Sequence, residues 1–426
     1  MIPRLALAVL VLAACPLTAQ PPAAKPVAAK SVAFAGAVSR PTGPGTYEVV
    51  PAGADLTADE LLVMLPGAGF ISVGGTVKVT SRADLTGLSP VFETAVIPHA
   101  FDPAKVDAEF TLDRGRIDIL NVGKGSAAVA VRVRDRRWRV TLDQAGTRVA
   151  VELSGRWPTG TDYQPKPPAA HAPVFSAVAV VLNGSADISD GVTTLHLTAP
   201  PGPAMVTWTS ASAAPPVAVK LASPPAWTLD RPALTPAQRL AAEAAVVALE
   251  KFRSLQAARP AAAIEEMLAS PRPEDRLIGL IEAGAHDDLP RLTTAIAEVK
   301  DAAVWDAGVS VLRHWLGRGA GQDAKLVAFL TASRGYTPTQ AALVVRLLNG
   351  FTPAEAARPE TYEVLIEYLR HDQSAVRTLA AWHLVRLAPA VGAGTFAPNA
   401  GKPESEVLYK RWKDAIPSGR LPPRLK

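Results

Sequence analysis

Histidine and cysteine side chains are the residues of this 426-residue chain best suited to metal binding or nucleophilic chemistry. The chain has seven histidines, and none of them forms an i,i+4 pair or an HExxH motif. Its single cysteine cannot build a thiolate-rich zinc site or an intrachain disulfide. Neither a GxSxG elbow nor a GxxxxGK[ST] loop occurs. The sequence therefore predicts no catalytic residue, no metal and no cofactor, and we expect that the protein is not an enzyme.

Two local patterns resemble sites but favour a structural interpretation. His383 lies on the apolar stripe of a predicted helix, which indicates a hydrogen-bonded core residue and not a ligand. The glycine-rich run 317–321 follows a predicted helix instead of a strand, so we expect a flexible turn between helices. Catalytic residues can converge without a motif, which leaves a cell-wall hydrolase as a remaining alternative.

Four arginines form the most suggestive binding pattern. Arg132, Arg134, Arg137 and Arg139 alternate with apolar residues along two segments joined by a turn. If the apolar residues face the core, the four guanidinium groups share the outer face of a hairpin. Guanidinium groups pair with phosphate and carboxylate groups, so this face could bind an anionic envelope polymer or a carboxylate-rich partner. The alternative is a solvated face whose charges discourage edge pairing.

The first residues indicate export. An apolar run from Leu5 to Leu12 follows Arg4, and this layout is typical of a secretory signal. The run ends in Leu12-Ala13-Ala14-Cys15, which resembles the lipobox of bacterial lipoproteins and implies lipidation at Cys15; cleavage after Ala19 is the alternative. We expect a periplasmic, outer-membrane or cell-surface lipoprotein, or otherwise a secreted protein. It would meet the membrane through the N-terminal lipid only.

Composition predicts two folded parts. The chain is 48% hydrophobic and 19% charged, so it can bury sizeable cores. Its net charge of +5 lacks the basic clustering typical of nucleic-acid binding, and we expect no nucleic-acid partner. The predicted organisation is a signal or lipobox region, a Pro/Ala-rich linker, a β-domain, a short linker and an α-helical domain, at residues 1–19, 20–45, 46–222, 223–232 and 233–426. The fold class is therefore multidomain α+β.

Period-two alternation with frequent turns predicts an antiparallel all-β sandwich or barrel over residues 46–222. One of these turns is expected at residues 113–116. Residues 112–117, 140–151 and 180–186 resemble the strand motifs of FecR-type β-domains. Members of that family are periplasmic or surface proteins that often relay envelope events, so the resemblance implies an envelope location and a sensory role. This chain has no spanning helix with which to carry such a signal.

Apolar residues at spacings of three and four predict paired helices over residues 233–426. Thr337 and Thr352 each stand three residues before Gln340 or Glu355, which is the capping-box spacing. Residues 273–280, 301–312 and 372–384 resemble the second helix of HEAT-like repeats, and this resemblance implies a protein-binding helical stack.

Together these patterns predict a non-enzymatic exported envelope protein. We expect a binding or sensory scaffold that acts through protein–protein interaction, with another envelope protein as its partner. Binding of anionic envelope polymer through the arginine face is the alternative, and a cell-wall hydrolase is the third hypothesis.

Overall fold

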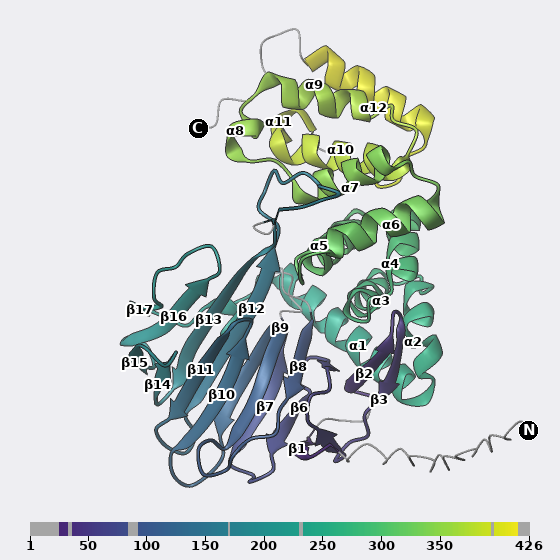
Figure 1. Ribbon diagram of the computed structural model, residues 1–426. Coiled ribbons are helices and arrows are strands. Elements are labelled where there is room, and N and C mark those ends of the chain that lie inside the picture. The colour runs from purple at the N-terminus through teal and green to yellow at the C-terminus, as the bar shows by residue number, and fades with distance from the viewer. Residues whose placement is uncertain are drawn as a thin grey trace, which may run out of the picture.

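The computed structural model describes residues 25–32, 36–83, 93–168, 171–229, 233–392 and 396–415. A mostly β region comes first in the chain and a helical region follows, so the predicted two-part α+β class is confirmed (Figure 1). The helices lie along one side of the β region and extend beyond its end (Figure 1).

Strand pairings in the β region fall into two sheets that share the long strand β9 (Ala108–Asn121). Besides β9, the first sheet contains, in spatial order, β4 (Asp55–Thr57), β1 (Val27–Ser31), β6 (Gly69–Ser72), β7 (Val77–Arg82), then β12 (Arg148–Arg156), β13 (Val174–Asn183), β16 (Pro203–Thr209) and β17 (Val217–Lys220). The second contains β3 (Thr46–Val49), β2 (Val38–Gly43), β5 (Leu62–Met64), β8 (Thr94–Pro98), then β10 (Ala127–Val133), β11 (Arg136–Leu142), β14 (Ser185–Ser189) and β15 (Thr194–Thr198).

β9 bends where it passes from one sheet to the other. Its first half pairs with β8 and β10, and its second half pairs with β7 and β12. Gly115 stands at the change with φ +93°, and a Cβ there would lie 2.1 Å from the Glu93 carbonyl oxygen. The predicted turn at residues 113–116 is therefore wrong, because a bent but continuous strand replaces it.

Thr76 contacts the residues that flank both ends of β9. The Thr76 hydroxyl donates to Oδ1 of Asp107, just before β9, at 3.0 Å, and the Thr76 carbonyl oxygen accepts from the backbone N of Val122, just after β9, at 2.9 Å. β10 starts beside Asp107, whose Oδ2 accepts from Ala128 N at 2.8 Å. β10 consequently runs parallel to the first half of β9, and this pair departs from the predicted antiparallel pattern.

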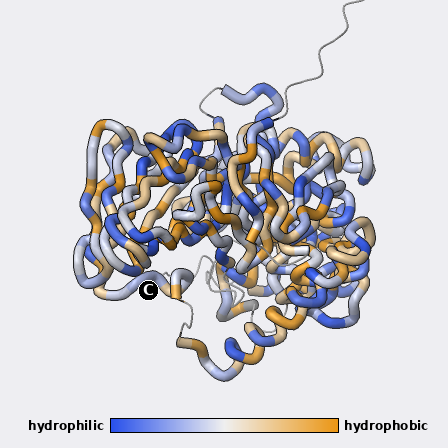
Figure 2. Tube along the Cα trace, turned by 90° about the horizontal axis from the view of Figure 1, so that it is seen from below, coloured by the Kyte–Doolittle hydropathy of each residue, from blue (hydrophilic) through white to orange (hydrophobic). Residues whose placement is uncertain are grey.

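Both sheets contribute to one apolar core. Val79, Ile119 and Val151 of the first sheet belong to the same buried cluster as Val131 and Trp138 of the second. Polar and apolar residues follow one another closely along the chain (Figure 2), as expected for strands with one buried side.

Two strands lie inside the segment for which the sequence predicts a linker. β1 and β2 both fall within residues 20–45, so the linker prediction is wrong for them. Ala29 and Val38 are 2% exposed, because β4, β6, β3 and β5 supply backbone partners that composition does not reveal.

The helical region begins at Pro236, after a short 3-10 turn, η1 (Ala226–Thr228). Its helices are α1 (Pro236–Ala258), α2 (Pro260–Leu268), α3 (Pro273–Ala285), α4 (Leu289–Glu298), α5 (Ala302–Leu316), α6 (Gln322–Arg334), α7 (Pro338–Asn349), α8 (Pro353–Ala356), α9 (Pro359–Tyr368), α10 (Ser374–Leu387), α11 (Pro389–Gly392) and α12 (Lys402–Ala415). The capping boxes at Thr337 and Thr352 are confirmed, with Gln340 and Glu355 as the returning side chains.

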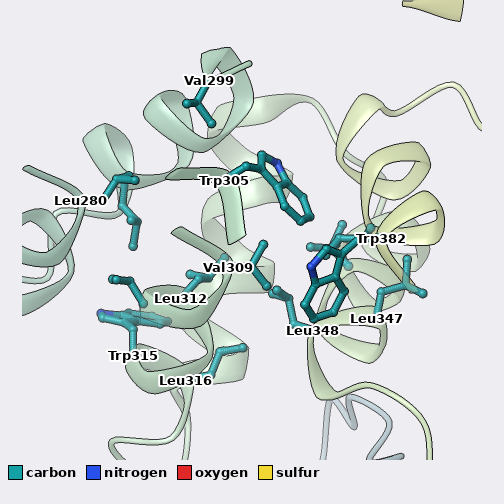
Figure 3. Packing of buried hydrophobic residues seen from close by; sticks show 14 of the residues in the cluster. Leu280, Val299, Trp305, Val309, Leu312, Trp315, Leu316, Leu347, Leu348 and Trp382 are labelled. Carbon is teal, nitrogen blue, oxygen red and sulfur yellow. The ribbon is translucent and has the colours of Figure 1, made fainter. Parts of the chain in front are cut away.

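The helices are arranged as successive contacting pairs. α2 contacts α3, α4 contacts α5, α6 contacts α7, and α9 contacts α10. The second members form a row, because α3 contacts α5, α5 contacts α7, and α7 contacts α10. Trp305, Val309 and Leu348 lie close together in the core along this row, with Trp382 on the neighbouring helix (Figure 3).

Candidate functional site

Three of the four predicted arginines lie on the outer face of the β10–β11 hairpin. Arg132 stands directly opposite Arg137 in the strand register, and Arg139 lies two residues further along β11. All three are exposed, whereas Val131 and Trp138 beside them are buried in the core. This part of the predicted pattern follows from alternation along two paired strands.

Glu109 of β9 lies beneath two of these arginines. Its Oε1 accepts from Arg132 Nη2 at 2.6 Å, and its Oε2 accepts from Arg137 Nη2 at 2.9 Å. Burial raises the pKa of the Glu109 carboxyl, but the hydrogen bonds from Arg137 and Arg132 outweigh it and hold this pKa below its ordinary value. One carboxylate thus orients two guanidinium groups and leaves the face with net positive charge.

Arg134 does not share this face, so the prediction is wrong for it. The residue follows the end of β10 with φ +57°, and this left-handed conformation ends the alternation of the strand. Its guanidinium lies 3.8 Å from the centre of the Phe175 ring, and Nη2 donates to the Arg318 carbonyl oxygen at 2.9 Å. Arg134 therefore joins the β region to the helices.

The predicted role of His383 is confirmed. The side chain is 6% exposed, and Nε2 lies 2.7 Å from the Leu347 carbonyl oxygen. Burial lowers the pKa of His383 to about 4, so the ring is neutral at pH 7. Among the residues that the structure describes, no group of three or more His, Cys, Asp or Glu side chains could hold a metal ion.

A buried ion-pair cluster joins the two regions around Glu93. Glu93 Oε1 accepts from Arg114 Nε at 2.8 Å and from Arg318 Nε at 2.9 Å. Arg318 Nη1 also donates to Asp287 at 2.7 Å, and Arg114 Nη2 donates to the Ala285 carbonyl oxygen at 2.9 Å. Glu93 and Arg114 come from the β region, while the other partners come from helices or their connections.

Two buried carboxyl groups in this cluster have pKa values that are shifted in opposite directions. Burial alone would raise the pKa of Glu93, but the charges of Arg318 and Arg114 outweigh it and lower the pKa to about 2. Glu282 lies nearby, and no arginine of the described residues forms an ion pair with it. Burial, followed by repulsion from Glu93, raises its pKa to about 8. Glu93 is therefore ionised at pH 7, whereas Glu282 is protonated.

Ser39, His286 and Glu282 have the residue types of a nucleophile–base–acid triad. Their contacts, however, are those of a buried hydrogen-bond network and not of a catalytic site. Ser39 Oγ lies 2.8 Å from His286 Nε2, while His286 Nδ1 lies 2.9 Å from the Glu282 backbone carbonyl oxygen. Because a carbonyl only accepts, Nδ1 carries the proton and Nε2 accepts from the serine. Ser39 and His286 are 2% and 1% exposed, so the hydroxyl is closed to substrate in this structure.

The sequence did not predict this cluster. Residues 317–321 connect α5 to α6 as expected, yet Arg318 within them is held by Glu93 across 225 positions of sequence. The only available signal was a charged residue inside a glycine-rich turn, and such a residue carries no information about its partner.

Cys15 lies outside the residues that the structure describes. Within the described part of the chain, no helix combines the length and the apolar character needed to cross a bilayer. Comparisons with protein-family models, with curated proteins and with solved structures found no match to this chain.

Proposed function

We propose that this chain is a non-enzymatic binding scaffold of the bacterial envelope, and that its partner is an acidic surface on another exported protein. The observation that carries the proposal is the exposed cluster of Arg132, Arg137 and Arg139 on one hairpin face. Guanidinium groups on a fixed support pair well with carboxylates, and they are enriched in protein interfaces.

Glu109 holds two of these arginines in place, and the third can bind a partner without breaking an ion pair. The side chains of Arg132 and Arg137 remain 46% and 58% exposed while bound to Glu109. Among the described residues Arg139 has no ion-pair partner, and it is exposed beside Arg137. Ordering two side chains in advance lowers the entropic cost of binding an acidic partner.

The proposal includes a FecR-like β-domain and a HEAT-like helical domain. The two sheets around one core support a FecR-like sandwich, and the row α3–α5–α7–α10 with outer helices α2, α4, α6 and α9 supports a HEAT-like stack. It also retains export, with a lipid at Cys15 or cleavage after Ala19, as the means by which the chain reaches an envelope partner. Fractionation of the full chain, with and without Cys15→Ser, tests that location.

The binding test compares two double variants of the full chain. R137Q/R139Q removes two charges from the arginine face, and R239Q/K410Q removes two from exposed positions on α1 and α12. Each is crosslinked in envelope preparations, recovered proteins are identified, and the acidic candidate is then titrated with the purified chain. We expect R137Q/R139Q to weaken that binding at least tenfold, and R239Q/K410Q to bind as the unmodified chain does.

Equal binding by both double variants would refute the arginine face as the interface. Anionic polymer is the second candidate, because the same exposed guanidinium groups pair with phosphate. Retention on immobilised polyphosphate that R137Q/R139Q abolishes, without any arginine-dependent protein partner, would replace the protein proposal with the polymer.

A further inference from the structure

A polar cavity of about 180 Å³ lies where the β region meets α5 and α7. Arg156, the last residue of β12, lines it together with Thr159 from the segment that follows. Ser310, Arg313 and His314 of α5 and Asn349 of α7 complete its polar lining. Figure 1 shows the segment after β12 extending toward α7, which places residues from both regions around one space.

The lining of this cavity is positively charged. It contains two guanidinium groups, and none of its eight residues carries a carboxylate. Burial lowers the pKa of His314 to about 4, so its imidazole is neutral at pH 7 and the positive charge comes from the two arginines. Asp306 is the acidic residue whose charge acts on Arg313, and it already accepts from Trp382 Nε1 at 2.7 Å and from Arg386. The cavity thus brings two guanidinium groups together, and no acidic side chain stands among the described residues that line it.

Backbone contacts hold the walls of the cavity in place. Trp157 Nε1 donates to the Leu316 carbonyl oxygen at 3.0 Å, and Asn349 Nδ2 donates to the Thr161 carbonyl oxygen at 2.9 Å. Arg313 donates through Nε to the Leu348 carbonyl oxygen, which leaves its terminal nitrogens for other acceptors. Gly350 has φ +74°, and a Cβ there would lie 3.0 Å from Arg313 Nη2, so glycine leaves room for this guanidinium.

The two guanidinium groups differ in exposure. Burial lowers the pKa of Arg313, and the positive charges of Arg386 and Arg156 lower it further. Bringing these cations together therefore costs free energy in the empty protein, and a bound anion would recover it. Arg156 and Thr159 are exposed, so a solute can reach the cavity from their side.

We propose that this cavity binds one small oxyanion, a phosphate or carboxylate group, between Arg156 and Arg313. Its volume is below the several hundred cubic ångströms typical of pockets for drug-sized ligands, which limits the bound part to a small group. Arginine donates in a fixed fork that matches both phosphate and carboxylate oxygens. The group is either a free ion or the end of a larger ligand. This site is separate from the arginine face on β10 and β11.

Calorimetric titration of the full chain at fixed ionic strength tests the proposal. The probes are inorganic phosphate, acetate, and one short peptide in its free-carboxylate and amidated forms. We expect one saturable site for at least one probe, weakened at least tenfold by Arg156→Gln and abolished by Arg156→Glu. Arg156 is exposed at the end of its strand, so both variants should fold, and circular dichroism verifies this.

Arg239→Gln is the matched control, because it removes one exposed arginine charge from α1, away from both proposed sites. It should leave the titration unchanged. Binding of inorganic phosphate or acetate identifies a free ion, and binding of the free-carboxylate peptide alone identifies the end of a larger ligand. The proposal is overturned if no probe binds saturably, or if Arg156→Glu and Arg239→Gln bind alike. Neither result bears on the partner of the β10–β11 arginines.

Discussion

The backbones of Gly155 and Gly317 touch where the sheet meets the helices. A Cβ at Gly155 would lie 2.1 Å from the Gly317 carbonyl oxygen, and a Cβ at Gly317 would lie 2.0 Å from the Gly155 carbonyl oxygen. Gly155 is in β12 and Gly317 directly follows α5, so each residue leaves space for the other region. Any side chain at either position must push the two regions apart.

We expect Gly155→Ala to destabilise the contact between the regions. The substitution forces an overlap with backbone, which cannot move aside as a flexible side chain does, and overpacking of this kind costs about 1–3 kcal/mol. Scanning calorimetry should show a lower unfolding temperature, with the β and helical regions unfolding in separate steps. Gly319→Ala is the control, because a Cβ there would meet nothing within 4 Å. Equal unfolding profiles for the two variants would contradict the prediction.

A second prediction concerns the buried carboxylate that joins the two regions. Glu93→Gln removes the negative charge that Arg114 and Arg318 share, and it leaves both guanidinium groups buried with less compensation. Breaking a buried ion pair in this way costs about 3–5 kcal/mol. Chemical denaturation should show this loss, while Glu48→Gln, at a side chain that is 68% exposed, should have little effect.

The contribution of Glu93 should also depend on pH. Its pKa is about 2 in the folded protein and near 4.5 ordinarily, so the unfolded chain binds the proton more readily. The stabilisation is therefore present above about pH 4.5 and is lost as the pH falls toward 2. Denaturation between pH 3 and 7 should show a steeper acid loss for the unmodified chain than for Glu93→Gln. Parallel curves would be evidence against the ion pair.

Glu282 should have the opposite pH dependence. Its folded pKa of about 8 exceeds its ordinary value of 4.5, so the folded protein retains a proton that the unfolded chain releases. The stabilisation is complete below about pH 4.5, declines as the pH rises, and is lost by about pH 8. Glu282→Gln keeps the neutral form at every pH, so it should unfold at higher temperature than the unmodified chain at pH 9.

The control for Glu282 is Glu363→Gln, because Glu363 is exposed on α9. It should not alter the difference in unfolding temperature between pH 6 and pH 9. If Glu282→Gln shows the same alkaline loss as the unmodified chain, Glu282 is ionised in the folded protein at neutral pH.

Local periodicity explains how much of this fold the sequence could predict. Alternation placed Val131 and Trp138 in the core and Arg132, Arg137 and Arg139 outside it, because β10 and β11 are adjacent in sequence and pair directly. The helices were predicted for the same reason, since capping and apolar spacing depend on residues only a few positions apart.

Features that depend on distant partners were not predicted. β1 and β2 look like linker by composition, and pairing with strands further along the chain makes them part of the sheets. The left-handed backbone conformation of Arg134 places this residue away from the predicted face, and Glu93 pairs with Arg318 across the junction between the two regions. A single sequence contains no local signal for such contacts, so the junction and its cavity emerge only from the structure.

The last prediction concerns Trp305, which is buried in the helical core. Trp305 is 2% exposed and lies near Trp382 of α10 (Figure 3). The centroid of its ring is 6.1 Å from that of Trp382 and 5.1 Å from that of Phe396. Trp305→Ala removes contacts with both rings and leaves a cavity, so we expect a loss of about 3–5 kcal/mol. Leu240→Ala on α1 is the control, because Leu240 is 69% exposed.

The same variant tests how strongly the two regions depend on each other. Trp305 lies in α5, whose C-terminal end carries the Gly317 contact with β12. If that contact couples the regions, Trp305→Ala should lower the unfolding temperature of the sheet as well, measured by the β component of the circular dichroism spectrum. Combining it with Gly155→Ala should remove this effect on the sheet, because the weakened junction no longer transmits it. A sheet transition unchanged by Trp305→Ala alone would show that the regions unfold independently.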